Sequence, residues 1–457
     1  MKSRQHRASK RRVVALLSAG ILGTSAVRAF ADDLPWSGQP AAAPQLGTVG
    51  CADAGAALSD VPEASREAVG RALAELDSQV ADAYSRLSAP GSGDTEGSVL
   101  AALADRRAQT LKKLSESAGL GSGLPKDLSG TATCVVRHDR VVEESAKVYS
   151  ADGEGGAVAR TKAPAQSDYL PKSGFVDIYH VPPNAAAPLP KGSATGSFRS
   201  RCGRNEDRHL NSDNVIVAPG VSNGAHHTHD YVGNVATDAV SSDSVLAASG
   251  TTCSNGDRSA YFWPVLRVLD GTDDPGSPGG SLDRNVGRIL VPVEVDITYT
   301  SRVGNPVQPM ARFLRIITGD PKAFTTGSAN VRASWSCTGL ENRQVVGRYP
   351  ICPQGSRVLR TLKFPDCWDG RNIDSANHRT HTAFSEATGA CPKDFKAIPQ
   401  LVERIAYDVP AGLRYAVDSF PEQLHNPITD HGYFVNNMND SLLEQMTSCV
   451  NQGRRCE

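Results

Sequence analysis

Three histidines lie within four positions of one another in the stretch SNGAHHTHDYVGN, which spans residues 222–234. The β-branched and aromatic residues around them favour an extended backbone. Side chains alternate between the two faces of a strand, so we expect His227 and His229 to share a face and His226 to point away. Neutral imidazole is a common ligand of zinc and copper. The stretch therefore predicts a pair of side chains that contacts one metal ion or one substrate.

Two further stretches combine histidine with carboxylates and aromatic residues. PDCWDGRNIDSANHRTH covers residues 365–381, and HNPITDHGYFVNNMND covers residues 425–440. In the first of these, His378 and His381 would share a face if the chain were locally helical. Together the three stretches hold seven of the eleven histidines. This distribution predicts that the stretches assemble into one pocket.

The residues of these stretches fall into three roles by their chemistry. The candidate acid/base residues are His227, His229, Asp369, His378, His381 and His431. The candidate substrate contacts are Trp368, Asp374, Tyr433 and Asn234. The candidate ligands of a divalent zinc or copper ion are His227, His229 and His381. The alternative is that these histidines are half-buried structural residues, because HxH also arises by chance and no stretch matches HExxH.

The N-terminus has the features of an export signal. A basic start is followed by an apolar run from Val13 to about Val27 and by a small-x-small cleavage site at Ala29-Phe30-Ala31. We therefore expect a signal peptide over residues 1–31 and a secreted, extracellular mature chain. The Arg11-Arg12 pair leaves both the general and the twin-arginine export routes open. No later segment has the roughly 20 uncharged apolar residues of a membrane span, so none is expected.

Charge and cysteine content narrow the class of partner. The 48 basic and 49 acidic residues nearly cancel, which gives no reason to expect nucleic acid or an anionic membrane as a partner. Ten cysteines, none of them in a CxxC pair, favour up to five disulfides over a thiolate zinc site. We expect a monomer. Proximity in the sequence favours the pairs 51–134, 202–253, 337–352, 367–391 and 449–456.

The chain divides into regions of different composition. Residues 45–135 carry two amphipathic segments on either side of PGSGDTEG, which predicts a helical hairpin. Residues 136–174 are interpreted as a linker because much of this segment is rich in Gly, Ala and Pro. Residues 175–457 alternate short β-type runs with turn residues, which favours a mainly β main domain, an antiparallel β-sandwich or jelly roll. The expected strands are VDIYHV, NVIVAP, SAYFWPVLRVL, GRILVPVEVDITYTS, ARFLRIITGD, SRVLRTLKF, RIAYDV and LRYAVD.

One helix is expected near the end of the main domain. The segment NDSLLEQMTSCVNQ has helical periodicity, with Asn439 or Asp440 as the candidate N-cap. Tyr261 and Trp263 alternate on one strand face, which is expected to face the core. Trp368 lies in a loop rich in Gly, Asn and Asp and is the candidate platform for a sugar ring.

The motifs of the main domain, taken in order, resemble a known family. They include DNVIVAPGVSNGAHHTHDYVGN, CSNGDRSAYFWPVLRV, FLRIITGDPKA, FPDCWDGRNIDSANHRTH and DHGYFVNNMND. Over about residues 200–450 the chain is similar to the secreted family labelled domain of unknown function nineteen ninety-six, of fungi and actinobacteria. The family pattern keeps a His-x-His like His227/His229 and a terminal histidine like His431. Fungal members usually carry an aspartate where this chain has Tyr433, which argues against a role that needs a carboxylate there.

The resemblance also implies a class of substrate. Some members of the family carry a carbohydrate-binding module, which implies work on cell walls or polysaccharides. We therefore expect a secreted enzyme that acts on a polysaccharide or cell-wall glycan by hydrolysis or β-elimination, with the histidines as acid/base groups or metal ligands. The rival is a non-catalytic extracellular protein that binds glycan or metal through the same residues. Release of product distinguishes the two.

Overall fold

The computed structural model describes residues 48–52, 54, 66–88, 93–117, 128–137, 172–184, 193–269, 285–304, 306–375, 377–420 and 423–457. The expected signal peptide and most of the expected linker lie outside these residues. Within the described residues, no helix is both long enough and apolar enough to cross a membrane.

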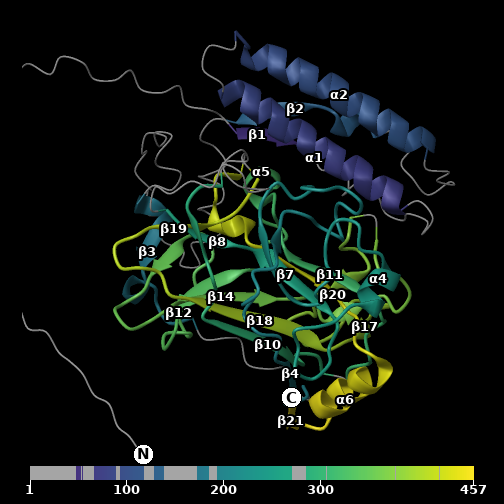
Figure 1. Cartoon of the computed structure of the whole chain (residues 1–457), viewed down its shortest axis with the longest axis vertical. Helices are drawn as coiled ribbons and strands as arrows, with labels where there is room; N and C mark the ends of the chain where they lie inside the picture. The colour runs from purple at the N-terminus through teal and green to yellow at the C-terminus, as the bar shows by residue number, and fades with distance from the viewer. Residues whose placement is uncertain are drawn as a thin grey trace, which may run out of the picture. The chain divides into compact units, whose positions relative to one another are not determined.

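The N-terminal region forms the expected helical hairpin (Figure 1). Helices α1 (Arg66–Ser88) and α2 (Glu96–Ser117) lie side by side, and apolar side chains at helical spacing, such as Leu76 and Leu111, are buried between them. Strands β1 (Thr48–Cys51) and β2 (Cys134–Arg137) pair next to the helices. The hairpin therefore has its own small core.

Two sheets dominate the main domain. The six-stranded sheet has the order β12 (Ser334–Cys337), β14 (Val358–Lys363), β18 (Gln400–Tyr407), β10 (Glu294–Thr300), β4 (Ser197–Ser200) and β21 (Arg455–Cys456). All of its pairs are antiparallel except that of β21 with β4. The five-stranded antiparallel sheet has the order β11 (Arg315–Gly319), β20 (His431–Val435), β7 (Ala260–Pro264), β6 (His229–Gly233) and β5 (Leu210–Asn211).

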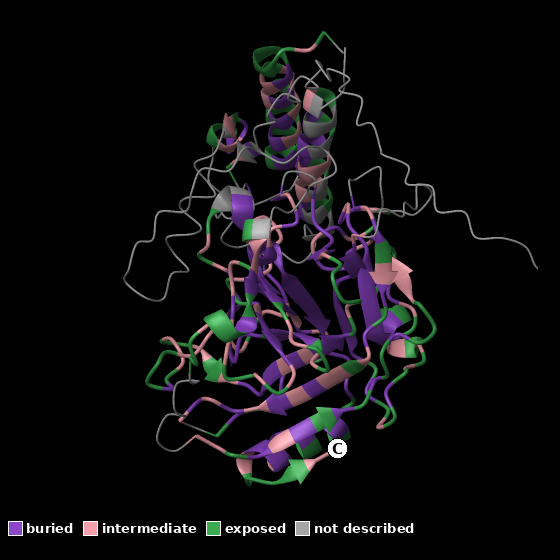
Figure 2. Ribbon diagram, turned by 90° about the vertical axis from the view of Figure 1, so that its left-hand side faces the viewer, coloured by how far each residue is buried: buried purple, intermediate pink, exposed green. Residues whose placement is uncertain are grey.

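These two sheets share one apolar core. Phe198 and Ile297 of the six-stranded sheet are buried in the same cluster as Tyr261, Trp263 and Phe434 of the five-stranded sheet. Figure 2 shows buried strands through the middle of the main domain. The prediction of a mainly β domain with a sandwich-like arrangement is confirmed, as is the prediction that Tyr261 and Trp263 face the core.

Smaller elements surround the two sheets. Two three-stranded sheets have the orders β19 (Tyr415–Val417), β8 (Leu266–Val268), β9 (Arg288–Leu290) and β16 (Thr382–Ala383), β15 (Cys367–Trp368), β17 (Lys396–Ala397). Strand β13 (Tyr349–Ile351) pairs in parallel with β3 (Phe175–Asp177). Among the described residues of this domain, the α-helices are α4 (Asp243–Ala248), α5 (Ala323–Thr326) and α6 (Asp440–Asn451). Short 3-10 helices cover Ser129–Thr131, Lys172–Gly174, Ile178–His180 and Pro427–Thr429.

Two expectations about local structure are confirmed. Asn439 is the N-cap of α6, where its side chain accepts a hydrogen bond of 2.9 Å from the backbone N–H of Leu442. The ten cysteines form the five expected disulfides, and no cysteine is free. The pairs are Cys51–Cys134, Cys202–Cys253, Cys337–Cys352, Cys367–Cys391 and Cys449–Cys456.

Two expected strands are wrong in whole or in part. The run NVIVAP is a series of turns, because the Asn214 side-chain oxygen accepts hydrogen bonds of 3.0 Å from the N–H groups of both Ile216 and Val217. Such a side-chain bond to the following backbone competes with a strand ladder. In VDIYHV the strand ends at Asp177, whose carboxylate caps the 3-10 turn Ile178–His180.

Candidate metal centre

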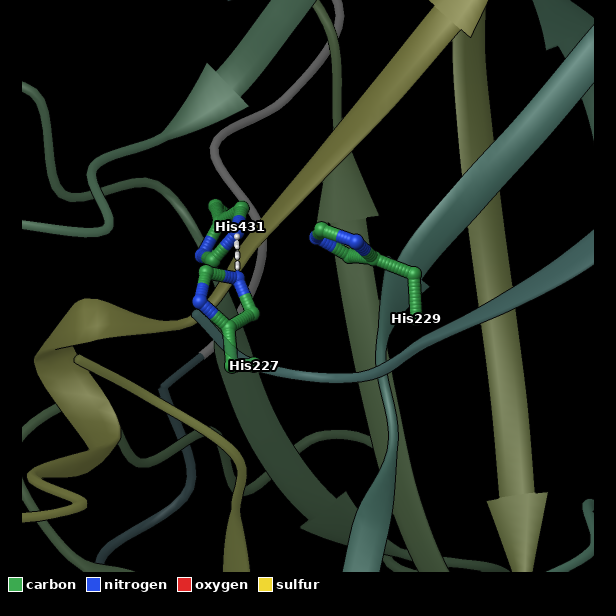
Figure 3. Close-up of side chains that lie close together, drawn as sticks. All are labelled: His227, His229 and His431. Carbon is green, nitrogen blue, oxygen red and sulfur yellow. Dashed lines mark hydrogen bonds between the residues drawn. The ribbon is translucent and has the colours of Figure 1, made fainter. Parts of the chain in front are cut away.

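Three imidazole rings from two of the three histidine-rich stretches meet in the interior of the main domain. His227 lies in the loop before β6, His229 is the first residue of β6, and His431 is the first residue of β20. Strand β7 pairs with both β6 and β20, so it holds the two histidine-bearing strands on either side of itself. In Figure 3 the ring of His229 points toward the other two rings.

The spacing of the ring nitrogens fits the coordination of one ion. The Nε2 atoms of His227 and His431 are 3.2 Å apart, and a ligand nitrogen from each ring lies within 4.8 Å of those of the other two. Two nitrogens bound to one tetrahedral zinc at its usual bond length are about 3.3 Å apart. The only other such cluster among the described residues contains Cys202 and Cys253, which are disulfide-bonded to each other and so cannot be ligands.

Hydrogen bonds leave ring nitrogens available for an ion. The Nδ1 N–H of His431 donates to the Thr429 carbonyl at 2.8 Å, which fixes the tautomer and directs a lone pair from Nε2 into the cluster. Neither nitrogen of His229 has a hydrogen bond of good geometry, nor has Nδ1 of His227. The Asp213 carbonyl lies near His229 and favours its protonation, but it does not complete a hydrogen bond. Unpaired buried nitrogens cost free energy that a bound ion would recover.

Burial keeps these rings neutral. Burial and then the neighbouring His226 lower the pKa of His227 to about 3. Burial and then His227 lower the pKa of His229 and that of His431 well below the usual value. A metal binds the neutral form of imidazole, so the rings are in the state that coordination requires without first losing a proton.

Aromatic side chains enclose the cluster. The ring centroid of Phe420 lies 5.2 Å from that of His227, and the ring of Phe262 lies 5.6 Å from that of His229. Tyr433, a candidate substrate contact, packs edge-on at 5.5 Å from His229 and 5.1 Å from His431. The three histidines are 1%, 0% and 1% exposed. An ion held here would be surrounded by apolar groups and shielded from bulk water.

The local conformation before β6 differs from the expected strand. The strand begins only at His229, and His226 has a left-handed φ of 52°. His227 and His229 nevertheless contact each other, with ring centroids 4.6 Å apart. The expected pairing is therefore present, but a turn brings the two side chains together where strand alternation was expected to do so.

The second histidine-rich stretch forms a separate group. His381 uses both ring nitrogens, one 2.9 Å from the Ser375 hydroxyl and the other 2.6 Å from the Arg315 carbonyl. It therefore has no nitrogen free to join His227 and His229 on an ion, and His431 occupies the third position in its place. The prediction that all three stretches assemble into one pocket is corrected accordingly: histidines of two of them meet in a buried cluster, and the third stretch lies against strand β11.

A histidine–aspartate pair is the main feature of this second group. Nδ1 of His378 lies 2.9 and 3.1 Å from the two carboxylate oxygens of Asp374, while its Nε2 is buried without a hydrogen bond. Burial alone would raise the pKa of Asp374, but His378 and then His381 outweigh it and lower the pKa. His378 itself has a left-handed φ of 56°. Such an orienting carboxylate is typical of a histidine that acts as a base or a ligand.

The remaining candidates have structural contacts. Asp369 accepts hydrogen bonds of 2.9 Å from the N–H groups of Arg371 and Asn372, which forms the turn after β15. Trp368 is half-buried, and its indole N–H donates to the Asn372 carbonyl at 2.7 Å, so it is not the exposed platform that was expected. Asn234 is 1% exposed, and its amide donates to two backbone carbonyls.

Sequence reasoning missed several residues of the centre. Phe420 and Phe262 line the cluster, and two buried arginines, Arg267 and Arg360, lie behind it. Arginine and phenylalanine in apolar runs give no signal of their position in a sequence. The sequence signal that was available is a pair of dipeptides, His229-Asp230 and Asp430-His431. Each places a carboxylate next to a candidate metal ligand.

A β-sandwich with a buried three-histidine cluster is the class of domain that the fold and the site define. The family model described as Domain of unknown function (DUF1996) matches residues 214–436. This match confirms the resemblance of the motifs, and the matched segment contains all three histidines. No curated protein and no solved structure matches the chain.

Proposed function

We propose that this chain is an extracellular metal-dependent enzyme that acts on a polysaccharide or cell-wall glycan, with its ion held by His227, His229 and His431. The observation that carries the metal is the convergence of three buried, neutral imidazoles at coordination spacing. A divalent ion bound there would act as a Lewis acid or lower the pKa of a bound water. The five disulfides are compatible with an oxidising, extracellular location.

The glycan part of the proposal rests on other support. It follows from the export signal expected at the N-terminus and from the carbohydrate-binding modules of related family members. Hydrolysis and β-elimination both need a group that moves a proton near the reacting bond. The Asp374–His378 pair is the second group of this kind, since the carboxylate orients the ring and leaves Nε2 without a partner.

A second candidate function follows from the burial of the centre. Catalytic zinc sites keep one coordination position open to substrate, whereas structural sites are closed. The three histidines are at most 1% exposed, which favours a non-catalytic protein that holds or sequesters a metal. The two functions share the ion and differ in whether substrate reaches it.

The metal centre is tested by elemental analysis of the full chain. The protein is first incubated with zinc or copper, and free ion is then removed. We expect one equivalent of metal in the wild type, and its loss in His227→Ala, His229→Ala and His431→Ala. His381→Ala is the matched control, because that histidine is equally buried but hydrogen-bonded at both nitrogens. The site would be rejected if the wild type held no ion, or if His431→Ala held as much as the wild type.

The reaction is tested on a panel of cell-wall polysaccharides with metal-loaded and chelated protein. Products that appear only with the loaded protein support the enzyme. Saturable glycan binding without products supports the non-catalytic alternative. If neither glycan binding nor products are detected, the glycan part of the proposal is rejected and only the metal centre remains.

A further inference from the structure

Two fully buried ion pairs lie beside the three-histidine centre. The side chains of Arg267 and Asp418 are 2% and 1% exposed, and those of Arg360 and Asp430 are both 0% exposed. The arginine–carboxylate pair Arg357–Asp408, in contrast, lies at the surface. Burial of an ion pair carries a large desolvation penalty, and well-packed apolar residues often give equal or greater stability. Their presence here therefore calls for a reason other than stability.

The first pair holds the residue between two of the histidines. Arg267 donates from Nε and Nη2 to the two carboxylate oxygens of Asp418, at 2.7 and 3.1 Å. Nη2 also donates to the hydroxyl of Thr228 at 3.3 Å, and Asp418 accepts from the Thr228 backbone N–H at 3.2 Å. The Thr228 carbonyl accepts from the N–H of Val265 at 2.9 Å. Thr228 is thus fixed at its side chain, its N–H and its carbonyl.

These hydrogen bonds to Thr228 constrain both of its neighbours in the chain. His227 and His229 are joined directly to it, and the turn that contains His227 has no strand ladder of its own. The bonds to Thr228 directly follow His227, whereas the nearest hydrogen bond on its other side is that of the Asn285 amide to the His226 carbonyl, at 3.2 Å. The Arg267–Asp418 pair therefore sets the backbone from which these two rings project.

The second pair links the start of β20, which carries His431, to β7, the strand that pairs with the His229-bearing β6. Arg360 donates from Nε to one carboxylate oxygen of Asp430 at 2.8 Å and from Nη2 to the other. Its Nη1 donates to the Pro264 carbonyl at 2.8 Å. Asp430 directly precedes His431, and Pro264 lies opposite His229 in the register of β6 with β7. One guanidinium thus ties the start of β20 to the end of β7 that faces His229.

We propose that Arg267–Asp418 and Arg360–Asp430 are positioning pairs, which set the spacing of the three imidazoles before an ion binds. This inference rests on the proposed metal centre. The planar guanidinium bonds a carboxylate at two points and so fixes orientation as well as distance, which a lysine cannot do. Outer partners that orient metal ligands in this way affect metal affinity without touching the ion.

The test uses the full chain with Co²⁺ as the probe, because its visible absorption spectrum reports coordination geometry. Arg267→Lys and Arg360→Lys keep the charge and remove the two-point geometry. We expect affinity for Co²⁺ to fall by about 10- to 100-fold in each, with an altered spectrum. Thr228→Val removes only the hydroxyl contact and is expected to weaken binding several-fold. Arg357→Lys, at an exposed pair, is the matched control and should behave as the wild type.

The outcomes separate this inference from the proposed function. If the wild type binds no Co²⁺, the metal centre itself is rejected. If the wild type binds but folded lysine variants, with native circular dichroism and all disulfides formed, match its affinity and spectrum, the positioning role is overturned. Should the lysine variants not fold, Thr228→Val decides, since wild-type affinity and spectrum in that variant would overturn the role of the Arg267 pair.

Discussion

The Nε2 atoms of His227 and His431 lie 3.2 Å apart although 204 residues separate them in the chain. Two positively charged rings could not approach so closely in a buried site, so at least one is neutral. In the metal-free protein, one ring donates a hydrogen bond to the other. Because His431 already donates from Nδ1 to a carbonyl, the donor in this contact is His227 when both rings are neutral. Binding of an ion would replace this single hydrogen bond.

We expect the metal-free protein to lose stability as the pH falls below about 6.5. An unfolded chain protonates its histidines near that pH. In the folded protein the pKa of His227 is lowered to about 3, and those of His229 and His431 are also lowered by burial. The unfolded state therefore binds more protons between these values, and each ring contributes a loss of up to about 1.4 kcal/mol per pH unit.

Urea unfolding of the metal-free protein at pH 7.5 and 5.5 measures this loss. Asp230, whose pKa is raised by burial to about 6, acts in the opposite direction, so the wild type must be compared with a variant. His227→Gln removes one of the three rings and should show a smaller difference between the two pH values. An equal difference in both proteins would contradict the assignment of a low pKa to His227.

Replacement of His229 should stabilise the metal-free protein while it abolishes metal binding. Both of its ring nitrogens lack a good hydrogen bond, and the rings of Phe262 and Tyr433 pack against it. Leucine at this position removes the unpaired polar atoms and keeps most of the volume. We expect His229→Leu to raise the free energy of unfolding by about 1 kcal/mol, measured by urea titration after chelation.

His381→Leu is the control for that substitution. This ring is equally buried, but both nitrogens are hydrogen-bonded, so its replacement should lower the free energy of unfolding by about 1 to 3 kcal/mol. A loss of similar size in His229→Leu would mean that His229 serves the fold and not an ion.

Gly319 is expected to be essential for the position of His431. It has a left-handed φ of 76°, and a Cβ atom there would lie 2.2 Å from the Asp430 carbonyl oxygen and 2.7 Å from Cα of His431. Gly319→Ala should cost about 3 kcal/mol of unfolding free energy and weaken metal binding. Gly355→Ala has a similar φ with nothing within 4 Å, so it should cost about 1 to 2 kcal/mol and leave the metal bound. Equal costs would refute the proposed clash.

The disulfide between Cys367 and Cys391 should stabilise the second histidine group and not the metal centre. It closes a sequence separation of 24 residues that includes Asp374, His378 and His381. The double replacement by alanine should cost about 3 kcal/mol and expose this loop to limited proteolysis. The three histidines of the centre come from other elements, so we expect the metal content to stay unchanged. Loss of the ion in this variant would show that the two groups depend on each other.

Much of the architecture could be predicted from local patterns. Short runs rich in apolar residues, such as SAYFWPVLRVL and SRVLRTLKF, became strands β7, β8 and β14, which are buried at every position except Lys363. The disulfides join the cysteines that proximity in the sequence had favoured. The run NVIVAP failed for an equally local reason, since the Asn214 side chain bonds the backbone that a strand would need.

The composition of the centre could be predicted only in part. His227 and His229 are two positions apart, so their meeting required only local structure. His431 joins the cluster because its strand pairs with β7. His381 does not, because a carbonyl and a hydroxyl occupy both of its ring nitrogens. His227 and His431 are separated by 204 residues, and their contact depends on the order of strands in the sheet. No local sequence pattern encodes that order.

The disulfides join each cysteine to the next one along the chain, and no bond encloses or interlaces with another. If thiols are oxidised as the polypeptide emerges residue by residue, the second cysteine of each pair finds a single unpaired predecessor. That order of events yields the native connectivity directly, without a mispaired intermediate that must be opened and exchanged. Production of the protein would then depend on a thiol oxidase and place little demand on a disulfide isomerase.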